Sequence, residues 1–227
     1  GARILAVKTG VGGGTRFGSD VGNSGILTSI TTNADGTVRF NGDVTTSGDQ
    51  TYSDAAVLES DATFTGAGIT FAAGIDSAST PNDLTIVASS VGAIGADSGT
   101  GVGLRNVLIT APTVTLRSVR TSNSQVYNGA TTLNGTLASV SSGSINVNGA
   151  LTLSGNSALT TSGGSGSNVA VTGAITGGGF DLDLNAGSLG NLTLGGNATG
   201  LDALTARGAT VAFADIDTAG NTTINAT

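Results

Sequence analysis

An internal repeat constrains the fold of this chain more than any other feature. Residues Val44 to Leu58 read VTTSGDQTYSDAAVL, and residues Val119 to Leu133 read VRTSNSQVYNGATTL. The two segments align without a gap, and their identical positions include the only two tyrosines of the chain. Self-similarity of this kind in a Gly- and Thr-rich sequence is typical of stacked repeat architectures. The identical pairs are Val44/Val119, Thr46/Thr121, Ser47/Ser122, Gln50/Gln125, Tyr52/Tyr127, Ala55/Ala130 and Leu58/Leu133.

Short segments with the pattern apolar, polar, apolar recur along the whole chain. Alternation with a period of two predicts β-strands. The predicted strands are Val38–Phe40, Ile69–Phe71, Leu84–Ile86, Val114–Leu116, Ile145–Val147, Leu151–Leu153, Val169–Val171, Leu182–Leu184, Leu192–Leu194 and Val211–Phe213. Residues that favour tight corners separate them. Such corners are Asn33–Gly36, Asn41–Gly42, Asn128–Gly129, Asn134–Gly135, Asn148–Gly149 and Gly177–Gly179.

Strand length favours one all-β architecture over the others. Sandwiches usually need strands of about 5 to 6 residues, whereas a parallel β-helix accepts shorter ones because each coil lies about 4.8 Å from the next. The sequence therefore predicts an all-β parallel β-helix, or β-solenoid, of short strands with Gly and Asn corners. At roughly 20 residues per coil, the chain would form about 10 to 11 coils. The two tyrosine motifs would mark the same corner three to four coils apart.

The repeat pattern also predicts the domain organisation. Residues 1–227 are interpreted as a single repeat array, an excerpt of a longer chain whose ends lack polar caps. The copies cover approximately residues 38–112 and 113–187. A third, partial copy lies near 208–227, where Ile216–Ile224 resembles the start of the motif.

Composition excludes several classes of partner. The net charge is −7 and the eight basic residues are scattered, which argues against nucleic-acid binding and binding to anionic membranes. No stretch approaches the roughly 18 apolar residues of a membrane-spanning helix, so no membrane insertion is expected. Aromatic residues make up only 4%. We therefore expect a core of many small aliphatic contacts.

The chain offers few groups for chemistry. It has no histidine and no cysteine, which excludes Ser-His-Asp and Cys-His nucleophile systems. It also excludes metal sites built from histidine or thiolate ligands. The tightest acidic pairs are Asp181/Asp183 and Asp215/Asp217. Each pair would project to one side of a strand, as a carboxylate couple, a calcium site or simply a solvent-facing pair. We interpret them as solvent-facing, and predict no catalytic residue, no cofactor and no metal ligand.

Two glycine-rich stretches resemble binding loops only superficially. Thr9–Thr15 follows an apolar segment, but the last glycine of a dinucleotide fingerprint is replaced and no helical pattern follows. Gly177–Gly179 departs from the calcium-binding nonapeptide repeat because Phe180 occupies a required glycine position. The first stretch is predicted to be a corner or an insertion loop, and the second a corner.

Two further sets of residues are candidates for recognition or modification. Gln50, Tyr52, Gln125 and Tyr127 are repeat markers, either of a repeated ligand surface or, more simply, of repeated core positions. Asn-x-Thr triplets are acceptors for N-glycosylation, and exposed loops would be accessible. The triplets begin at Asn134, Asn191, Asn197, Asn221 and Asn225.

The motif resembles a known family. TSGDQTY followed by AAVL and then GAGITF, between Thr46 and Phe71, is similar to the repeats of filamentous-haemagglutinin-like exoproteins. These are large adhesins secreted by bacterial two-partner systems, and related autotransporter passengers share the repeats. The similarity runs from about Val38 to Leu153 and more loosely to Thr227. It implies a right-handed parallel β-helix, a location outside the cell and an adhesive or filamentous role. The family's secretion domain is not recognisable here.

Three functions follow in order of preference. The first is a structural and adhesive, non-enzymatic segment of a large secreted bacterial cell-surface protein, with host, cell-surface or matrix ligands as partners. The second is a self-assembling extracellular filament or sheath subunit, in which β-helix ends stack on neighbouring copies. The third is a carbohydrate-active β-helix that uses clustered carboxylates.

Overall fold

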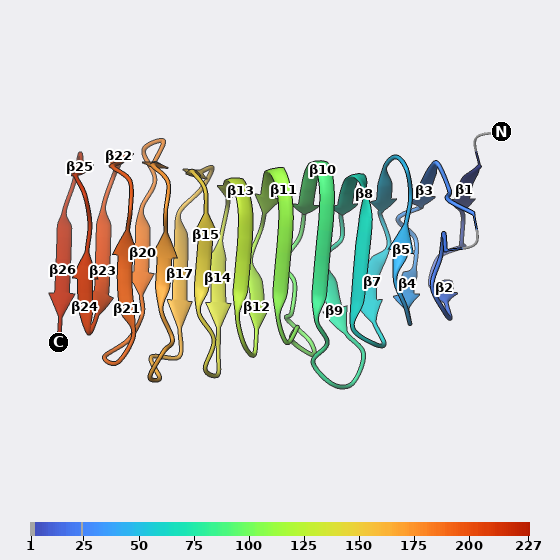
Figure 1. The fold of residues 1–227 in the computed structure, drawn as a ribbon, viewed down its shortest axis with the longest axis horizontal. Helices are drawn as coiled ribbons and strands as arrows, with labels where there is room; N and C mark the ends of the chain where they lie inside the picture. The colour runs from blue at the N-terminus through green and yellow to red at the C-terminus, as the bar shows by residue number, and fades with distance from the viewer. Residues whose placement is uncertain (1–2, 24) are drawn as a thin grey trace. The chain divides into compact units, whose positions relative to one another are not determined.

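The computed structural model describes residues 3–23 and 25–227, in which β-strands are the only regular elements. The chain divides into two compact units, unit 1 (Gly1–Thr115) and unit 2 (Leu116–Thr227). The strands of both units pair in parallel, and the two units together contain about 10 turns (Figure 1). The predicted all-β parallel β-helix is confirmed.

Unit 1 contains the first strands of the chain, most of them two to four residues long. They are β1 (Ile4–Val7), β2 (Gly14–Phe17), β3 (Ser29–Thr32), β4 (Thr37–Phe40), β5 (Val44–Thr45), β6 (Gln50–Tyr52), β7 (Ala55–Leu58), β8 (Ala62–Phe71), β9 (Ile75–Ser77), β10 (Leu84–Ile94) and β11 (Val107–Leu116), which ends at the unit boundary.

Unit 2 contains the remaining strands. They are β12 (Val119–Thr121), β13 (Gln125–Leu133), β14 (Thr136–Ser139), β15 (Ile145–Asn148), β16 (Leu151–Leu153), β17 (Ser157–Thr161), β18 (Val169–Val171), β19 (Ile175–Thr176), β20 (Leu182–Asn185), β21 (Asn191–Leu194), β22 (Ala198–Leu201), β23 (Leu204–Gly208), β24 (Thr210–Ala212), β25 (Ile216–Thr218) and β26 (Thr222–Ala226).

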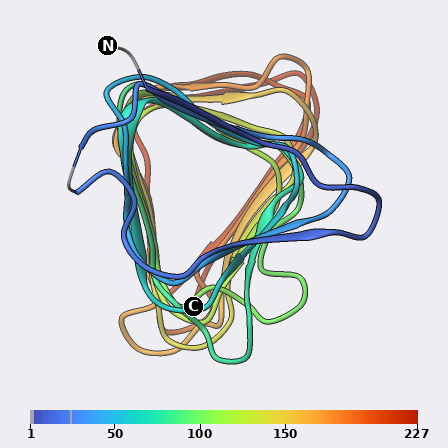
Figure 2. The same ribbon diagram turned by 90° about the vertical axis from the view of Figure 1, so that its right-hand side faces the viewer.

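Each unit is built from three stacks of strands, and the turns of each trace a three-sided outline (Figure 2). In unit 2 the stacks are β12-β14-β17-β20-β23-β26, β13-β15-β18-β21-β24 and β13-β16-β19-β22-β25. In unit 1, β2-β4-β7-β9 form one stack. The other two stacks of unit 1 share the long strand β8. Its first half pairs with β5 and its second half pairs with β6.

The turns differ in length. Residues paired on adjacent strands are 19 positions apart for Gln50 and Ile69 and 25 positions apart for Ile4 and Ser29. Some extra residues lie within strands, because the register shifts between Ala88 and Val91 where β10 pairs with β8, and between Ala198 and Leu201 where β22 pairs with β25.

The alternating pattern explains which side chains enter the core. Strands β4 and β18 bury Val38 and Phe40, and Val169 and Val171, and turn the residue between each buried pair outward. All ten predicted strands fall on observed ones, with one exception at the end of the last. Phe213 follows β24 and is 43% exposed.

The core of unit 1 contains a cluster of aromatic rings, which the composition did not predict. Phe40 packs against Tyr52 at 5.0 Å and against Phe64 at 4.9 Å between ring centroids, and Phe71 stacks on Tyr52 at 5.0 Å. All four rings are fully buried. We expected many small aliphatic contacts in place of a few bulky anchors. Aliphatic residues do make up most of this core, but the few aromatic residues gather on adjacent turns and form such an anchor. Edge-to-face pairs of this kind add to the free energy of area burial.

A column of glycines allows the backbones of successive turns to approach closely at one corner of unit 2. Gly149, Gly173 and Gly196 follow one another on successive turns, and a Cβ on Gly173 would lie 2.5 Å from the carbonyl carbon of Gly149. A Cβ on Gly196 would meet Gly173 at the same distance. The backbones approach too closely for any side chain, which is why this corner retains glycine.

Candidate functional sites

The first copy of the repeated motif is a buried corner in unit 1. Nε2 of Gln50 donates to the carbonyl oxygen of Val44 at 3.2 Å and to Oγ1 of Thr46 at 3.2 Å, which closes the corner between β5 and β6. It also donates to the carbonyl oxygen of Thr65 on the next turn at 2.9 Å. Tyr52 completes the network by donating from its phenol to Oε1 of Gln50 at 2.8 Å.

The second copy forms the same network in unit 2. Nε2 of Gln125 donates to the carbonyl oxygen of Val119, to Oγ1 of Thr121 and to the carbonyl oxygen of Ala138 on the next turn, at 3.1, 3.1 and 2.9 Å. The phenol of Tyr127 donates to Oε1 of Gln125 at 2.9 Å. The motif is therefore a local device that closes a corner and ties it to the following turn.

The two copies do not occupy equivalent corners, which corrects the expectation that they mark the same one. In unit 1 the strands on both sides of the motif, β5 and β6, pair with the single strand β8. In unit 2 they are β12 and β13, which pair with the separate strands β14 and β15. Because the network is local, it can close more than one kind of corner.

Burial decides how the glutamine and tyrosine markers can act. Gln50, Tyr52, Gln125 and Tyr127 have no exposed surface. Burial raises the pKa of both phenols, since the phenolate would lose its hydration. Side chains without accessible atoms cannot form a ligand surface, so the structure places them at core positions.

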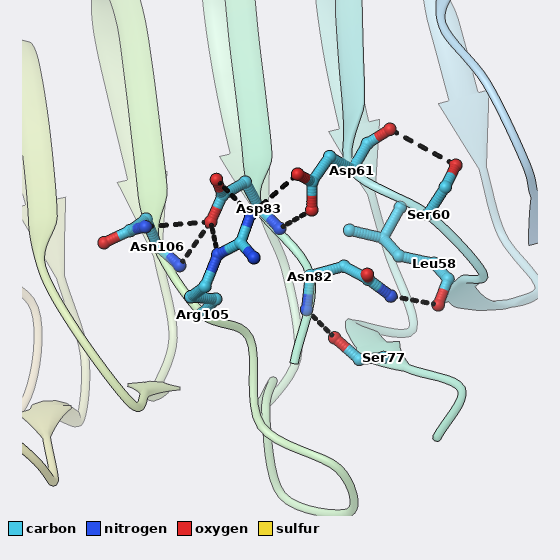
Figure 3. Close-up of polar contacts among 8 residues, drawn as sticks. All are labelled: Leu58, Ser60, Asp61, Ser77, Asn82, Asp83, Arg105 and Asn106. Atoms are coloured by element: carbon cyan, nitrogen blue, oxygen red, sulfur yellow. Dashed lines mark hydrogen bonds and ion pairs between the residues drawn. The ribbon is translucent and has the colours of Figure 1, made fainter. Parts of the chain in front are cut away.

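A cluster of charged and amide side chains lies on successive turns of unit 1 (Figure 3). Arg105 binds Asp83 in a bidentate ion pair, from Nε to Oδ1 at 2.8 Å and from Nη2 to Oδ2 at 2.7 Å. Its Nη2 also reaches Oδ2 of Asp61, one turn further, at 2.6 Å. The guanidinium thus joins its own turn to the two preceding ones, a contact that the sequence analysis did not identify. The signal was present in the sequence, because residues 61, 83 and 105 are evenly spaced by 22 positions.

The carboxylates of this cluster also hold backbone groups. Oδ1 of Asp61 accepts a bond from the backbone N–H of Asp83, and Oδ1 of Asp83 accepts one from the backbone N–H of Asn106. The side-chain hydrogen bonds from Arg105 are the largest cause that holds the pKa of Asp83 below its usual range. Burial opposes them as the second-largest effect, and the bonds from Asn106 and the charge of Arg105 add to the lowering. The carboxylates of Asp61 and Asp83 thus accept hydrogen bonds from within the cluster, and we interpret the cluster as a structural clamp.

Of the two predicted acidic pairs, one borders a groove in unit 2. Asp181 and Asp183 line an open groove of about 350 Å³ together with Thr136, Asn156, Ser157, Ala158, Leu182, Ala203 and Thr205. Asp183 is exposed, whereas Asp181 is half-buried and accepts bonds from the backbone of Ala203 and the amide of Asn156. Asp215 and Asp217 are both exposed. The leucines that alternate with Asp181 and Asp183 are fully buried, as the solvent-facing interpretation requires.

The glycine-rich stretches form corners. Thr9–Gly13 turns between β1 and β2, with Gly12 at a φ of 73°, and a strand follows it where a phosphate loop would need a helix. Gly178 and Gly179 have φ values of 62° and 82° in the turn before β20.

The five Asn-x-Thr acceptors lie in unit 2. Asn191, Asn197, Asn221 and Asn225 are exposed, whereas Asn134 is half-buried. Asn191 also accepts a bond from the hydroxyl of Thr210 at 2.7 Å. Glycosylation at these residues stays a prediction.

Residues 3–23 and 25–227 contain no group of three or more His, Cys, Asp or Glu side chains arranged to hold a metal ion. They include no helix that is long and apolar enough to cross a membrane. Comparison with protein-family models, curated proteins and solved structures gave no match.

Proposed function

We propose that this chain is a structural and adhesive segment of a large secreted bacterial surface protein, and that it acts outside the cell without catalysing a reaction. Two considerations support the proposal. The repeats resemble those of filamentous-haemagglutinin-like exoproteins, and the repeated motif is used inside the solenoid, where it joins successive turns. The outward side chains remain for contacts with host or matrix ligands.

The observation that carries the proposal is a column of outward threonines in unit 2. Thr132, Thr152, Thr176 and Thr199 are paired in register on β13, β16, β19 and β22. Three of them are exposed and Thr132 is half-buried. Parallel strands repeat about every 4.8 Å, so the column presents hydroxyl and methyl groups at regular intervals without charge. Such a face suits many weak contacts that add through multivalency.

Adhesion assays with the purified chain test this function. Fluorescent beads coated with the chain are expected to bind to surfaces carrying fibronectin, collagen or mucin. Replacing Thr152, Thr176 and Thr199 with aspartate should reduce this binding while the far-UV circular dichroism stays unchanged. A matched triple aspartate variant at Ala170, Thr193 and Ala212, an in-register column on another stack in which Thr193 and Ala212 are exposed, should bind normally. Equal binding by the two variants, or none by the parent chain, would contradict the proposal.

A carbohydrate-active role is the second candidate, favoured by the groove beside Asp181 and Asp183. Paired carboxylates are the groups that glycoside chemistry uses, and the groove volume lies within the range of small-ligand sites. Release of reducing ends from polygalacturonate, lost in both Asp181→Asn and Asp183→Asn, would support it. Absence of turnover across a panel of neutral and acidic polysaccharides would rule out the carbohydrate-active role.

A further inference from the structure

The threonine column of unit 2 is one row of a wider, regular face. Its members are paired in register on β13, β16, β19 and β22. An exposed alanine stands two positions before each of the first three threonines, at Ala130, Ala150 and Ala174. The residue between each alanine and its threonine is buried, as alternation along a strand requires. The strands therefore present a row of threonines beside a row of alanines, which together we call the threonine-alanine face.

The threonine-alanine face carries neither charge nor an aromatic ring. Its outward side chains are threonine, alanine and, two positions before Thr199, the exposed Asn197. The chain as a whole has a net charge of −7, so an uncharged face that extends over four paired strands is a distinct feature. The face ends at the next strand of the stack, β25, where Asp217 is exposed.

Unit 1 has a threonine row of its own. Thr31, Thr51 and Thr70 are paired in register on β3, β6 and β8. Thr31 is exposed and the other two are half-buried. The strands that carry this row read SITT, QTY and ATFTGAGITF, and they differ from those of the threonine-alanine face. Threonine rows thus occur in both units on different strand sequences, so the row is not a by-product of one copied segment.

The spacing of the rows fits a crystalline partner. Parallel strands repeat about every 4.8 Å, which is close to the distance between equivalent oxygen atoms along the a axis of hexagonal ice. Threonine hydroxyls hydrogen-bond to water, whereas the methyl groups of threonine and alanine order the water beside them without binding it. Rows of both groups therefore hold water molecules at intervals that an ice lattice can continue.

Charge also favours ice over other ordered solids. A mineral surface or an acidic polysaccharide would be recognised by charged side chains of opposite sign, and the outward residues of this face are all neutral. Ice is a neutral lattice of hydrogen-bonding groups, which matches them. We propose that the threonine-alanine face of unit 2 adsorbs to ice. The inference rests on the proposed adhesive function, and it names the surface to which the segment attaches.

Incorporation into growing ice tests the proposal. Ice is grown slowly from a solution of the full chain, and the protein concentration in the ice is compared with that in the remaining liquid. The parent chain should be enriched in the ice, whereas serum albumin should be excluded. Thr176→Tyr places a ring above the rows and should abolish the enrichment. The matched control Thr193→Tyr, at an exposed threonine of another stack, should keep it.

Two results would overturn the ice-binding face. One is exclusion of the parent chain from the ice. The other is equal behaviour of the two tyrosine variants, because the binding would then not depend on the threonine-alanine face. Both substitutions are at exposed residues, so both variants should fold, and far-UV circular dichroism checks that they do.

The bead assay contains no ice, so failure of the ice proposal and failure of the proposed function are distinguishable. A parent chain that binds the protein-coated surfaces but is excluded from ice refutes the ice-binding face alone. A parent chain that is enriched in ice but binds none of those coatings supports the ice-binding face and contradicts binding to host or matrix ligands.

Discussion

The phenol of Tyr127 donates a 2.9 Å hydrogen bond to Oε1 of Gln125, and neither side chain is exposed to solvent. Tyr127→Phe removes the donor and leaves that amide oxygen buried and unpaired. The free energy of unfolding in urea should fall by about 1 to 3 kcal/mol. The exposed control Thr176→Val should change it by less than about 0.5 kcal/mol. A Tyr127→Phe variant as stable as this control would show that the bond contributes nothing.

Alkaline titration should reveal both tyrosines only on unfolding. Burial raises the pKa of Tyr52 and Tyr127, whereas the unfolded phenols ionise near pH 10. Above that pH the unfolded state binds fewer protons than the folded state, so stability falls as the pH rises. The chain has no tryptophan and no other tyrosine, and phenolate absorbance near 295 nm therefore reports these two groups alone. It should rise together with the loss of far-UV circular dichroism. Ionisation near pH 10 in the folded chain would contradict the buried placement.

The aromatic cluster in the core of unit 1 should be sensitive to truncation. Phe64 packs edge-on against Phe40 and Phe71, with 4.9 Å between ring centroids in both pairs. Phe64→Ala should lower the free energy of unfolding by about 3 to 5 kcal/mol through lost burial and a cavity. Phe213→Ala, at a ring that is 43% exposed, serves as the control and should have a much smaller effect. Similar losses at the two positions would argue against a specific aromatic cluster.

The close approach at the glycine corner of unit 2 predicts a position that tolerates no side chain. Gly173→Ala would place a Cβ 2.5 Å from the carbonyl carbon of Gly149. We expect a loss of more than about 1 kcal/mol, measured by urea unfolding. At Gly164 the nearest atom would be 3.5 Å away, so Gly164→Ala should be neutral or slightly stabilising. If both variants behave alike, the backbones are further apart than the structure indicates.

The strands were predictable because each is a local pattern, whereas the arrangement of corners was not. Alternation around Val38 or Leu182 identifies an inward residue from its two neighbours alone. Which corner contains the glutamine and tyrosine network depends on the number of residues in every preceding turn. These numbers vary along the chain. A uniform period of 20 therefore assigned Tyr52 and Tyr127 to the same corner, although their networks close different ones.

Long-range pairs were missed for a related reason. The hydrogen bond from Arg105 to Asp61 spans 44 positions. The bond that Asp54 accepts from the backbone N–H of Gly36 likewise joins two turns. Such contacts follow from stacking, which no single segment encodes. The aromatic cluster was missed because composition counts residues and does not locate them.

The clamp between Arg105 and Asp83 predicts a pH-dependent contribution to stability. The hydrogen bonds from Arg105 lower the pKa of Asp83 in the folded chain. A group with a depressed folded pKa stabilises the fold above its unfolded pKa, near 4, and loses that contribution as the pH falls through the folded value. Arg105→Gln should therefore unfold at lower urea concentration than the parent chain at pH 7, and the difference should shrink toward pH 2.

The matched control for this prediction is Arg120→Gln, at an exposed arginine of unit 2. It should follow the parent chain at every pH, because its loss leaves the carboxylates of Asp61 and Asp83 paired. The pH profile separates an electrostatic clamp from simple packing by the arginine stem, since lost packing would lower stability equally at pH 7 and pH 2. A difference between Arg105→Gln and the parent chain that stays constant across this range would thus refute the electrostatic role.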